Sequence, residues 1–140
     1  MSESVYTRDI LRLASEIPYL GLLDDPDGSA DLRSPTCGSR VQVTITFDQE
    51  GRVAALGQIV SACAFGQAST ALMGAHAIGR SRAEVVTALA ALTDWLAGTR
   101  DDPGQWPGLE TLAPARPKTG RHGTILLPFR ALLAAIDSVL

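Results

Sequence analysis

The chain has 140 residues, of which 46% are apolar and 19% are charged, and its formal net charge is −3. This size and composition are typical of one globular domain over residues 1–140 with a substantial core. The slight negative charge argues against nucleic acid as the main partner, because such proteins present a basic face. No apolar run approaches the roughly 18 residues of a membrane span. Residues 1–6 lack the basic start and apolar stretch of a signal peptide, so we expect a cytoplasmic protein.

The first half of the chain predicts a helix, a long connection and a β-hairpin. Apolar residues recur at helical spacing from about 4 to 17, and Pro18 ends that helix. Residues 18–36 hold three prolines among acidic residues, glycines and serines, which predicts a mostly irregular connection. Alternating apolar and polar residues predict a strand over 40–48, and a turn ending at Gly51 returns the chain as a second strand over 52–62. Gly57 favours a bulge in that second strand.

The second half of the chain predicts three helices. Small residues favour a helix over 64–78, which Gly79 ends, and a capping box from Ser81 to Glu84 opens another over about 82–97. Residues 98–123 contain four prolines and five glycines, which predicts a loop with a helical turn near 109–112. The last helix is expected to start near Leu127 and Pro128, with the proline in its first turn, and to run to about 139. The order of elements predicts an α+β fold in which about four helices cover a small antiparallel sheet.

Cys37 and Cys63 are the only cysteines of the chain. Cys37 lies in a Pro/Gly loop that leads into the first hairpin strand, and Cys63 lies where the second strand gives way to a helix. Because a tight hairpin brings the start of one strand next to the end of the other, we expect the two cysteines to be neighbours in space. In a reducing compartment, such thiols are more often free or ligands than joined in a structural disulfide.

Two thiolates supply half of a tetrahedral metal site. His122, which precedes the last helix, reaches the pair if its loop folds back, whereas His76 lies roughly 20 Å further along a helix. The alternative interpretation is structural: Cys63 is a small core residue, Cys37 an incidental loop residue and His122 a solvated one. The residues alone leave both interpretations open.

Three motifs, in order and on the expected elements, resemble the iron–sulfur cluster assembly scaffolds of the NifU/IscU type, and most closely their SufU-like branch. The segment from Ser34 to Gly38, S-P-T-C-G, resembles the first cysteine loop of that family, N-P-x-C-G-D. The segment from Cys63 to Ser69, C-A-F-G-Q-A-S, resembles its second cysteine motif. The segment R-H-G-T-I-L-L-P-F-R-A, from Arg121, resembles its final motif, R-x-x-C-x-x-L-P-W-x-A.

The resemblance implies a metal site made by three thiolates and one carboxylate, and this chain departs from it at two positions. The aspartate of the family falls on Ser39, and its third cysteine falls on Thr124, or on Gly123 if the register slips by one residue. The resemblance therefore implies Cys37 and Cys63 as ligands, with His122, Thr124 and Ser39 as further candidates. It also implies a transient iron–sulfur cluster or zinc as the cofactor, and a cysteine desulfurase and cluster-recipient proteins as partners.

Three hypotheses about function follow. In the first, the chain is a scaffold or accessory protein that binds iron or a cluster, or accepts sulfur, through Cys37 and Cys63, and His122, a partner or the second protomer of a homodimer completes the site. In the second, the chain is a degenerate paralogue that keeps the fold for protein contact or regulation without metal. In the third, a cysteine is a nucleophile with His122 as its base. No motif indicates an oxyanion hole, so we expect a protein that is not an enzyme.

Overall fold

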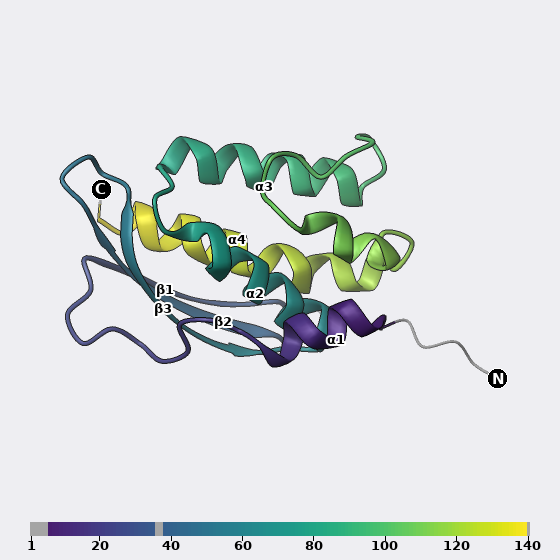
Figure 1. The fold of residues 1–140 in the computed structure, drawn as a ribbon, viewed down its shortest axis with the longest axis horizontal. Helices are drawn as coiled ribbons and strands as arrows, with labels where there is room; N and C mark the ends of the chain where they lie inside the picture. Colours follow the sequence, from purple (N-terminus) through teal and green to yellow (C-terminus); the bar gives the residue numbers. More distant parts are fainter. Residues whose placement is uncertain (1–5, 36–37, 140) are drawn as a thin grey trace.

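Among the residues that the structure describes, a three-stranded antiparallel sheet and four α-helices make up the fold, which is shown in Figure 1. The computed structural model describes residues 6–35 and 38–139. Helices α2 (Ala64–Ala77) and α4 (His122–Asp137) pack on the sheet, α1 (Arg8–Ser15) packs against α2, and α3 (Arg82–Leu96) packs against α4. The helices therefore lie on one side of the sheet, in two layers, and the predicted α+β class is confirmed.

The hairpin is confirmed as strands β2 (Arg40–Phe47) and β3 (Val53–Ser61), which pair antiparallel. The inward side chains of β2 are fully buried at Val41, Val43 and Ile45, as the alternation of the sequence requires. Arg40 lies opposite Ser61 in the register. The residues just before β2 and just after β3 are thereby brought to the same edge of the fold.

A third strand, β1 (Gly28–Arg33), lies inside the segment that the sequence predicted to be mostly irregular. It pairs antiparallel with β2, which gives the sheet order β1-β2-β3. Its inward residues include Gly28, which has no side chain, and Ala30, which has a small one, so the hydrophobic pattern of the strand is weak. Gly28 is small for a reason: a Cβ there would lie 2.3 Å from the carbonyl oxygen of Ala135 on α4. Because α4 packs closely on β1, small residues are required on the inward face of β1. The sequence therefore lacks the alternating apolar pattern that would have predicted this strand.

The predicted bulge at Gly57 is wrong, because Gly57 pairs regularly with Thr44 and the irregularity lies at Thr46 and Phe47 instead. A Cβ at Gly57 would lie 2.4 Å from the carbonyl oxygen of Gly21. Glycine is required here because the segment after α1 crosses β3 at this point.

Both central helices lie where the sequence predicted them, to within one residue at each end. The predicted capping box of α3 is present: the Ser81 hydroxyl accepts from the Glu84 amide, and the Glu84 carboxylate accepts from the Ser81 amide. Gly79 has φ +91°, which agrees with its expected role after α2. Helix α1 is shorter than predicted, since Thr7 caps it and it ends at Ser15.

The last helix starts at His122, five residues before the expected start. Pro128 therefore lies inside α4 rather than in its first turn. It has no N–H to donate to the carbonyl of Thr124. The neighbouring carbonyl of Ile125 accepts a 2.6 Å hydrogen bond from the buried Ser69 hydroxyl on α2. Packing against α2 thus supports the helix across its proline.

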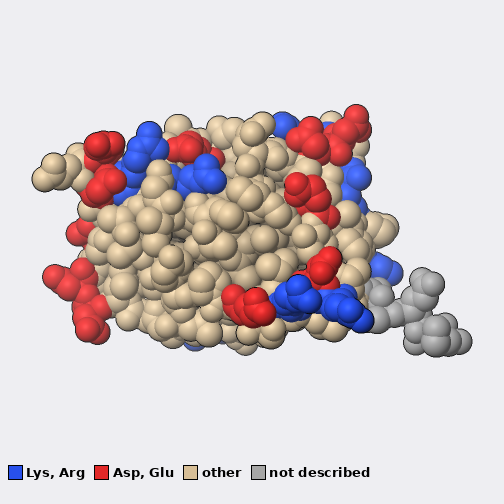
Figure 2. Space-filling model, in the orientation of Figure 1, with Lys and Arg blue, Asp and Glu red and all other residues tan. Residues whose placement is uncertain are grey.

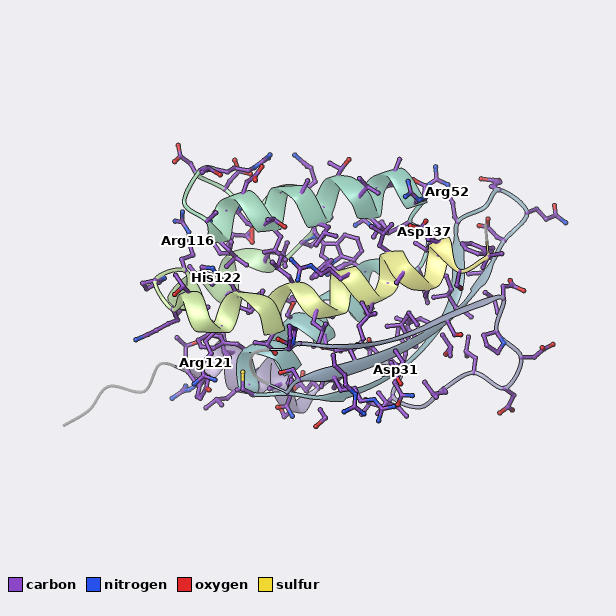
Figure 3. The ribbon with its side chains drawn as sticks, turned by 180° about the vertical axis from the view of Figure 1, so that it is seen from behind. Asp31, Arg52, Arg116, Arg121, His122 and Asp137 are labelled. Carbon is purple, nitrogen blue, oxygen red and sulfur yellow. The ribbon has the colours of Figure 1, made fainter. Side chains whose placement is uncertain are left out.

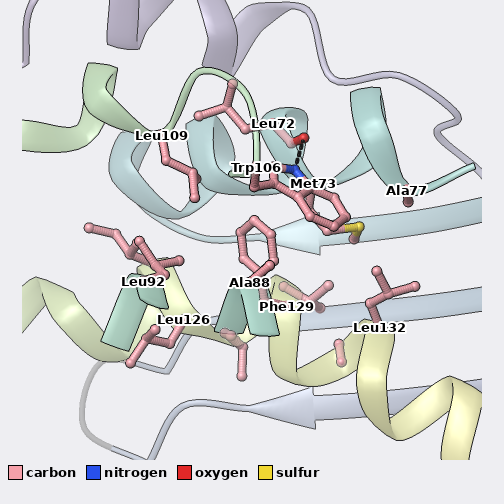
Figure 4. Packing of buried hydrophobic residues seen from close by; sticks show 14 of the residues in the cluster. Leu72, Met73, Ala77, Ala88, Leu92, Trp106, Leu109, Leu126, Phe129 and Leu132 are labelled. Carbon is pink, nitrogen blue, oxygen red and sulfur yellow. Dashed lines mark hydrogen bonds between the residues drawn. The ribbon is translucent and has the colours of Figure 1, made fainter. Parts of the chain in front are cut away.

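The segment between α3 and α4 is docked on the core, although its prolines and glycines predicted a loop. It contains two 3-10 helices, η1 (Leu109–Ala115) and η2 (Thr119–Arg121), and η1 confirms the helical turn that was predicted near 109–112. Trp106 is 3% exposed, and its indole N–H donates to the carbonyl of Leu72 over 2.9 Å. Figure 4 shows this hydrogen bond and the ring of Phe129 beside the indole, with a 5.2 Å separation of ring centroids. The segment is therefore part of the packed structure.

Charged side chains lie around the rim of the face shown in Figure 2, whose centre is uncharged. Among residues 6–35 and 38–139, no helix combines the length and the apolar character needed to cross a bilayer.

The carboxylate of Glu84 ties the hairpin loop to the start of α3. It accepts from the Ser81 amide and from Arg52 and Arg80, and these hydrogen bonds lower the pKa of Glu84 from 4.5 to about 2. Because the folded state lowers this pKa, the stabilisation is complete above about pH 4.5 and is lost as the pH falls through about 2.

The variant Glu84→Gln should therefore unfold at lower urea concentration than the unchanged chain at pH 7. The difference should shrink as the pH approaches 2, and a difference that does not change with pH would contradict this role of Glu84.

Candidate functional site

A cavity of about 260 Å³ lies where the sheet ends at the N-terminus of α4. Residues from three separate parts of the chain line it: Gly38, Ser39, Ser61, Ala62, Cys63 and Arg121. The hairpin register explains the first two parts, since the pairing of Arg40 with Ser61 places the flanking residues side by side. The 3-10 helix η2 brings Arg121 to the same place. Figure 3 shows Arg121 and His122 at this end of the fold, and Arg52 and Asp137 at the opposite end.

Cys63 is the N-cap residue of α2, with extended backbone angles of φ −68° and ψ 174°. Its side chain makes no capping hydrogen bond, and the first turn of α2 holds no acidic residue. The thiol is half-buried and free. It is therefore a reachable thiol at the N-terminus of α2.

Cys37 and Thr36 lie outside the described residues, so the predicted proximity of Cys37 and Cys63 stays a prediction. The residues around them close a loop, since the Ser34 amide donates to the Ser39 carbonyl over 2.8 Å and the Gly38 amide donates to the Ser34 carbonyl over 3.1 Å. Gly38, which follows Cys37 in the sequence, has φ +71° and lines the cavity.

Ser39 and Thr124 are brought together, as the resemblance implied for these two positions. Their hydroxyl oxygens lie 2.8 Å apart and share a hydrogen bond. Both residues are buried, at 5% and 1% exposure. A Cβ at Gly66 would lie 2.3 Å from the Thr124 hydroxyl, so this glycine provides the space for it. Of the two registers considered from the sequence, the structure places Thr124 against Ser39.

The imidazole of His122 points toward the end of η1. Its Nε2 lies 2.9 Å from the carbonyl oxygen of Arg116 and 3.1 Å from that of Ala115. As a donor to these carbonyls, the ring keeps only Nδ1 as an acceptor. His122 is absent from the lining of the cavity, and its role as a ligand stays a prediction. The other histidine, His76, lies in the last turn of α2, where burial, and then Arg80, lowers its pKa.

Arg121 was not among the site residues selected from the sequence. It is exposed, and no ion pair joins it to another described residue. The signal that could have found it was in the final motif, which begins at this arginine. Arg121 therefore adds a positive charge to the lining of the cavity, and neither the composition nor the placement of the cysteines indicated this residue.

The residues of this site do not fit a tightly held zinc ion within one chain. Among the described residues, no three histidine, cysteine, aspartate or glutamate side chains are grouped as metal ligands. The two hydroxyls where a carboxylate and a thiolate were implied bond to each other instead. Neutral hydroxyls are poor zinc ligands, and Arg121 adds a positive charge. Even if Cys37 joins Cys63, the chain supplies only two thiolates.

Comparison with known proteins gives matches at the level of structure. Neither a family model nor a curated protein matches the chain. The N-terminal part of a nitrogen-fixing NifU-like protein from Brucella abortus superimposes with a TM-score of 0.90 and 31% identity, over 96% of this chain and 94% of that one. A protein described as an iron–sulfur cluster assembly scaffold for the SUF system, from Fervidobacterium islandicum AW-1, has a TM-score of 0.83 and 20% identity, over 94% and 96%. A hypothetical protein shares the fold at a TM-score of 0.74 and 21% identity, over 92% and 94%.

Proposed function

Because this chain belongs to the NifU/IscU-type family of iron–sulfur cluster assembly scaffolds, we propose that it is a scaffold or accessory protein of cluster assembly in the cytoplasm. Cys37 and Cys63 accept sulfur and bind the nascent cluster as cargo. The observation that carries the proposal is the half-buried Cys63 thiol in a cavity that is also lined by Gly38, the residue next to Cys37. A cysteine desulfurase and cluster-recipient proteins are the partners that this role requires.

The remaining ligands come from outside the chain. A pair of protomers contributes two cysteines each, and four thiolates are the ligand set of a [2Fe–2S] cluster. The exposed edge of the cavity, with an exposed Gly38 and Ser61, is open to a second protein. We propose no catalytic role for Cys63 with His122, because carbonyl oxygens already hold the Nε2 of His122.

The runner-up function is a degenerate paralogue that keeps the fold for protein contact without metal. The hydrogen bond between Ser39 and Thr124 favours it, because that bond satisfies two buried hydroxyls with no metal present. Capture of the chain by a cysteine desulfurase separates the two functions. Binding that survives in the Cys37→Ser/Cys63→Ser variant supports the degenerate paralogue, and binding that is lost supports the cysteine-dependent role.

Anaerobic reconstitution with ferrous iron and sulfide tests the proposed function. The unchanged chain should retain both after desalting, and Cys37→Ser and Cys63→Ser should each lose them, because either change removes half of the thiolates. Ser61→Ala alters the same cavity without touching a thiol and should retain the cluster. Unchanged protein that retains neither iron nor sulfide would contradict the proposal.

A further inference from the structure

The two outer edges of the sheet differ in what covers them. The edge of β3 is covered, because the Gly21 amide donates to the Gln58 carbonyl over 2.9 Å and the Gln58 amide donates to the Tyr19 carbonyl over 3.0 Å. Strand β1 forms the other edge, and within the described part of the chain β2 is the one strand that pairs with it. An open edge presents unpaired backbone donors and acceptors to a further strand.

The register of β1 shows which backbone groups point out of this edge. The Ser34 amide donates to the Ser39 carbonyl over 2.8 Å, and these two residues continue the pairing of β1 with β2. Hydrogen-bonded pairs alternate along an antiparallel ladder. Leu32 therefore bonds to β2, whereas Asp31 and Arg33 turn their N–H and C=O groups outward.

Helix α4 closes only the start of the edge. The Ser29 amide, which points outward by the same alternation, donates over 3.1 Å to the hydroxyl of Ser138 at the end of α4. Among residues 6–35 and 38–139, no group outside the sheet accepts from the amides of Asp31 and Arg33. The open stretch is therefore the second half of β1.

A cavity of about 290 Å³ lies beside this stretch, between β1 and α4. Leu32, Pro35 and Leu127 form its apolar wall, and Arg33 and Arg130 supply its charge. No carboxylate lines the cavity, and neither arginine forms an ion pair with another described residue. A strand that paired with the open edge would place side chains in this cavity.

The charge of the open edge is positive. The Asp31 carboxylate accepts two hydrogen bonds from the Arg40 guanidinium, so its charge is already balanced within the chain. Arg33 and Arg130 have no such partner. Like charges on an edge disfavour pairing, and opposite charges favour it. The edge therefore selects an acidic strand over a basic one.

We propose that the open edge of β1 is a docking site for an extended acidic segment of a partner protein, which adds a fourth strand to the sheet. Main-chain hydrogen bonds form at Asp31 and Arg33, as in other cases of strand addition. Because side chains alternate along a strand, the one opposite Leu32 enters the cavity and its neighbours lie on the other face, beside Arg33. No thiol takes part, so the inference goes beyond the proposed function and does not depend on it.

The probe is a fluorescein-labelled peptide in which glutamate and leucine alternate, and fluorescence anisotropy measures its binding to the full chain. At low ionic strength it should bind about tenfold or more tightly than the peptide in which lysine replaces glutamate, and salt should reduce this preference. Arg33→Gln and Arg130→Gln should each weaken binding about threefold. Arg82→Gln removes the same charge beside Asp137, away from this edge, and should leave binding unchanged.

Strand pairing is tested by removing single N–H groups. Methylation of the glutamate amides, which face β1 when leucine lies opposite Leu32, should weaken binding about fivefold or more, whereas methylation of the leucine amides should not. In the protein, Asp31→Pro removes an outward N–H and leaves the ladder with β2 in place. Asp31→Ala removes the same carboxylate and keeps the N–H, so it should bind the peptide more tightly than Asp31→Pro.

Three results would overturn the proposal. Equal binding of the acidic and basic peptides would exclude the charge preference. Equal effects of the two methylated peptides would exclude strand addition and leave only a site for anions. A dimer in sedimentation equilibrium that Asp31→Pro dissociates would assign the edge to a second copy of the chain. The Cys37→Ser/Cys63→Ser variant should bind the peptide as the unchanged chain does, so failure of cluster retention and failure of this inference are separate results.

Discussion

The double variant Ser39→Asp/Thr124→Cys should bind one zinc ion per chain, with an affinity about a thousandfold or more above that of the unchanged protein. The two hydroxyls are already within 2.8 Å of each other at the cavity that holds Cys63. The substitutions replace them with a carboxylate and a thiolate, and with Cys37 and Cys63 they restore the four ligands that the family resemblance implies. Elemental analysis and competition with a chromophoric chelator give the stoichiometry and the affinity.

Two single variants show whether the added ligands are responsible. Thr124→Cys alone should raise zinc affinity by less than the double variant, and Thr124→Ser, which keeps the hydroxyl, should leave it unchanged. Gly66 leaves the space that the larger sulfur atom needs beside α2. If the double variant folds and binds zinc no better than the unchanged chain, then Ser39 and Thr124 are not the positions that separate this protein from a one-chain metal site.

Trp106→Ala should cost about 3–5 kcal/mol of the free energy of unfolding. The indole is 3% exposed, packs edge-on against Phe129 and donates to the carbonyl of Leu72. The guanidinium of Arg80 also lies 4.8 Å from the ring centroid. Truncation removes these contacts together and leaves a cavity in the main core. Urea denaturation at pH 7 measures the loss.

Trp106→Phe is the matched control, because it keeps an aromatic ring and removes the indole N–H. Leaving the Leu72 carbonyl unsatisfied should cost about 1–3 kcal/mol, less than the alanine variant. A loss below about 1 kcal/mol in Trp106→Ala would mean that the segment between α3 and α4 is not docked on the core in solution.

The elements with a strong periodic pattern could be predicted from the sequence. The alternation from Val41 to Phe47 predicted β2, and the capping box at Ser81 predicted the start of α3. These signals are local, because burial on one face and satisfaction of the first amides are decided by neighbouring residues.

The missed elements depend on contacts between distant residues. Strand β1 has small inward residues because α4 packs closely on it, and Gly57 is required by the crossing of Gly21. The early start of α4 depends on packing around Pro128, which the local proline rule cannot anticipate. In each case a tertiary contact outweighs the local preference.

The sequence predicted where the candidate site lies, but it did not predict which side chains hydrogen-bond there or which charge lines the cavity. The hairpin register placed Ser39 and Cys63 at the same edge, and the final motif placed Thr124 there. The hydrogen bond between the two hydroxyls and the entry of Arg121 depend on how η2 and α4 dock, which no periodicity encodes. His122 illustrates the limit, because its place beside the site in the sequence does not reveal that its Nε2 faces η1.

The central claim is that one chain holds half of a metal site and that a second molecule completes it. Native mass spectrometry of protein purified and reconstituted without oxygen tests this most directly, because it counts metal ions and chains in the same species. We predict single chains without zinc or iron, and iron with sulfide in species of two chains or of one chain with its partner. A single chain that carries one zinc ion or a cluster would contradict the claim.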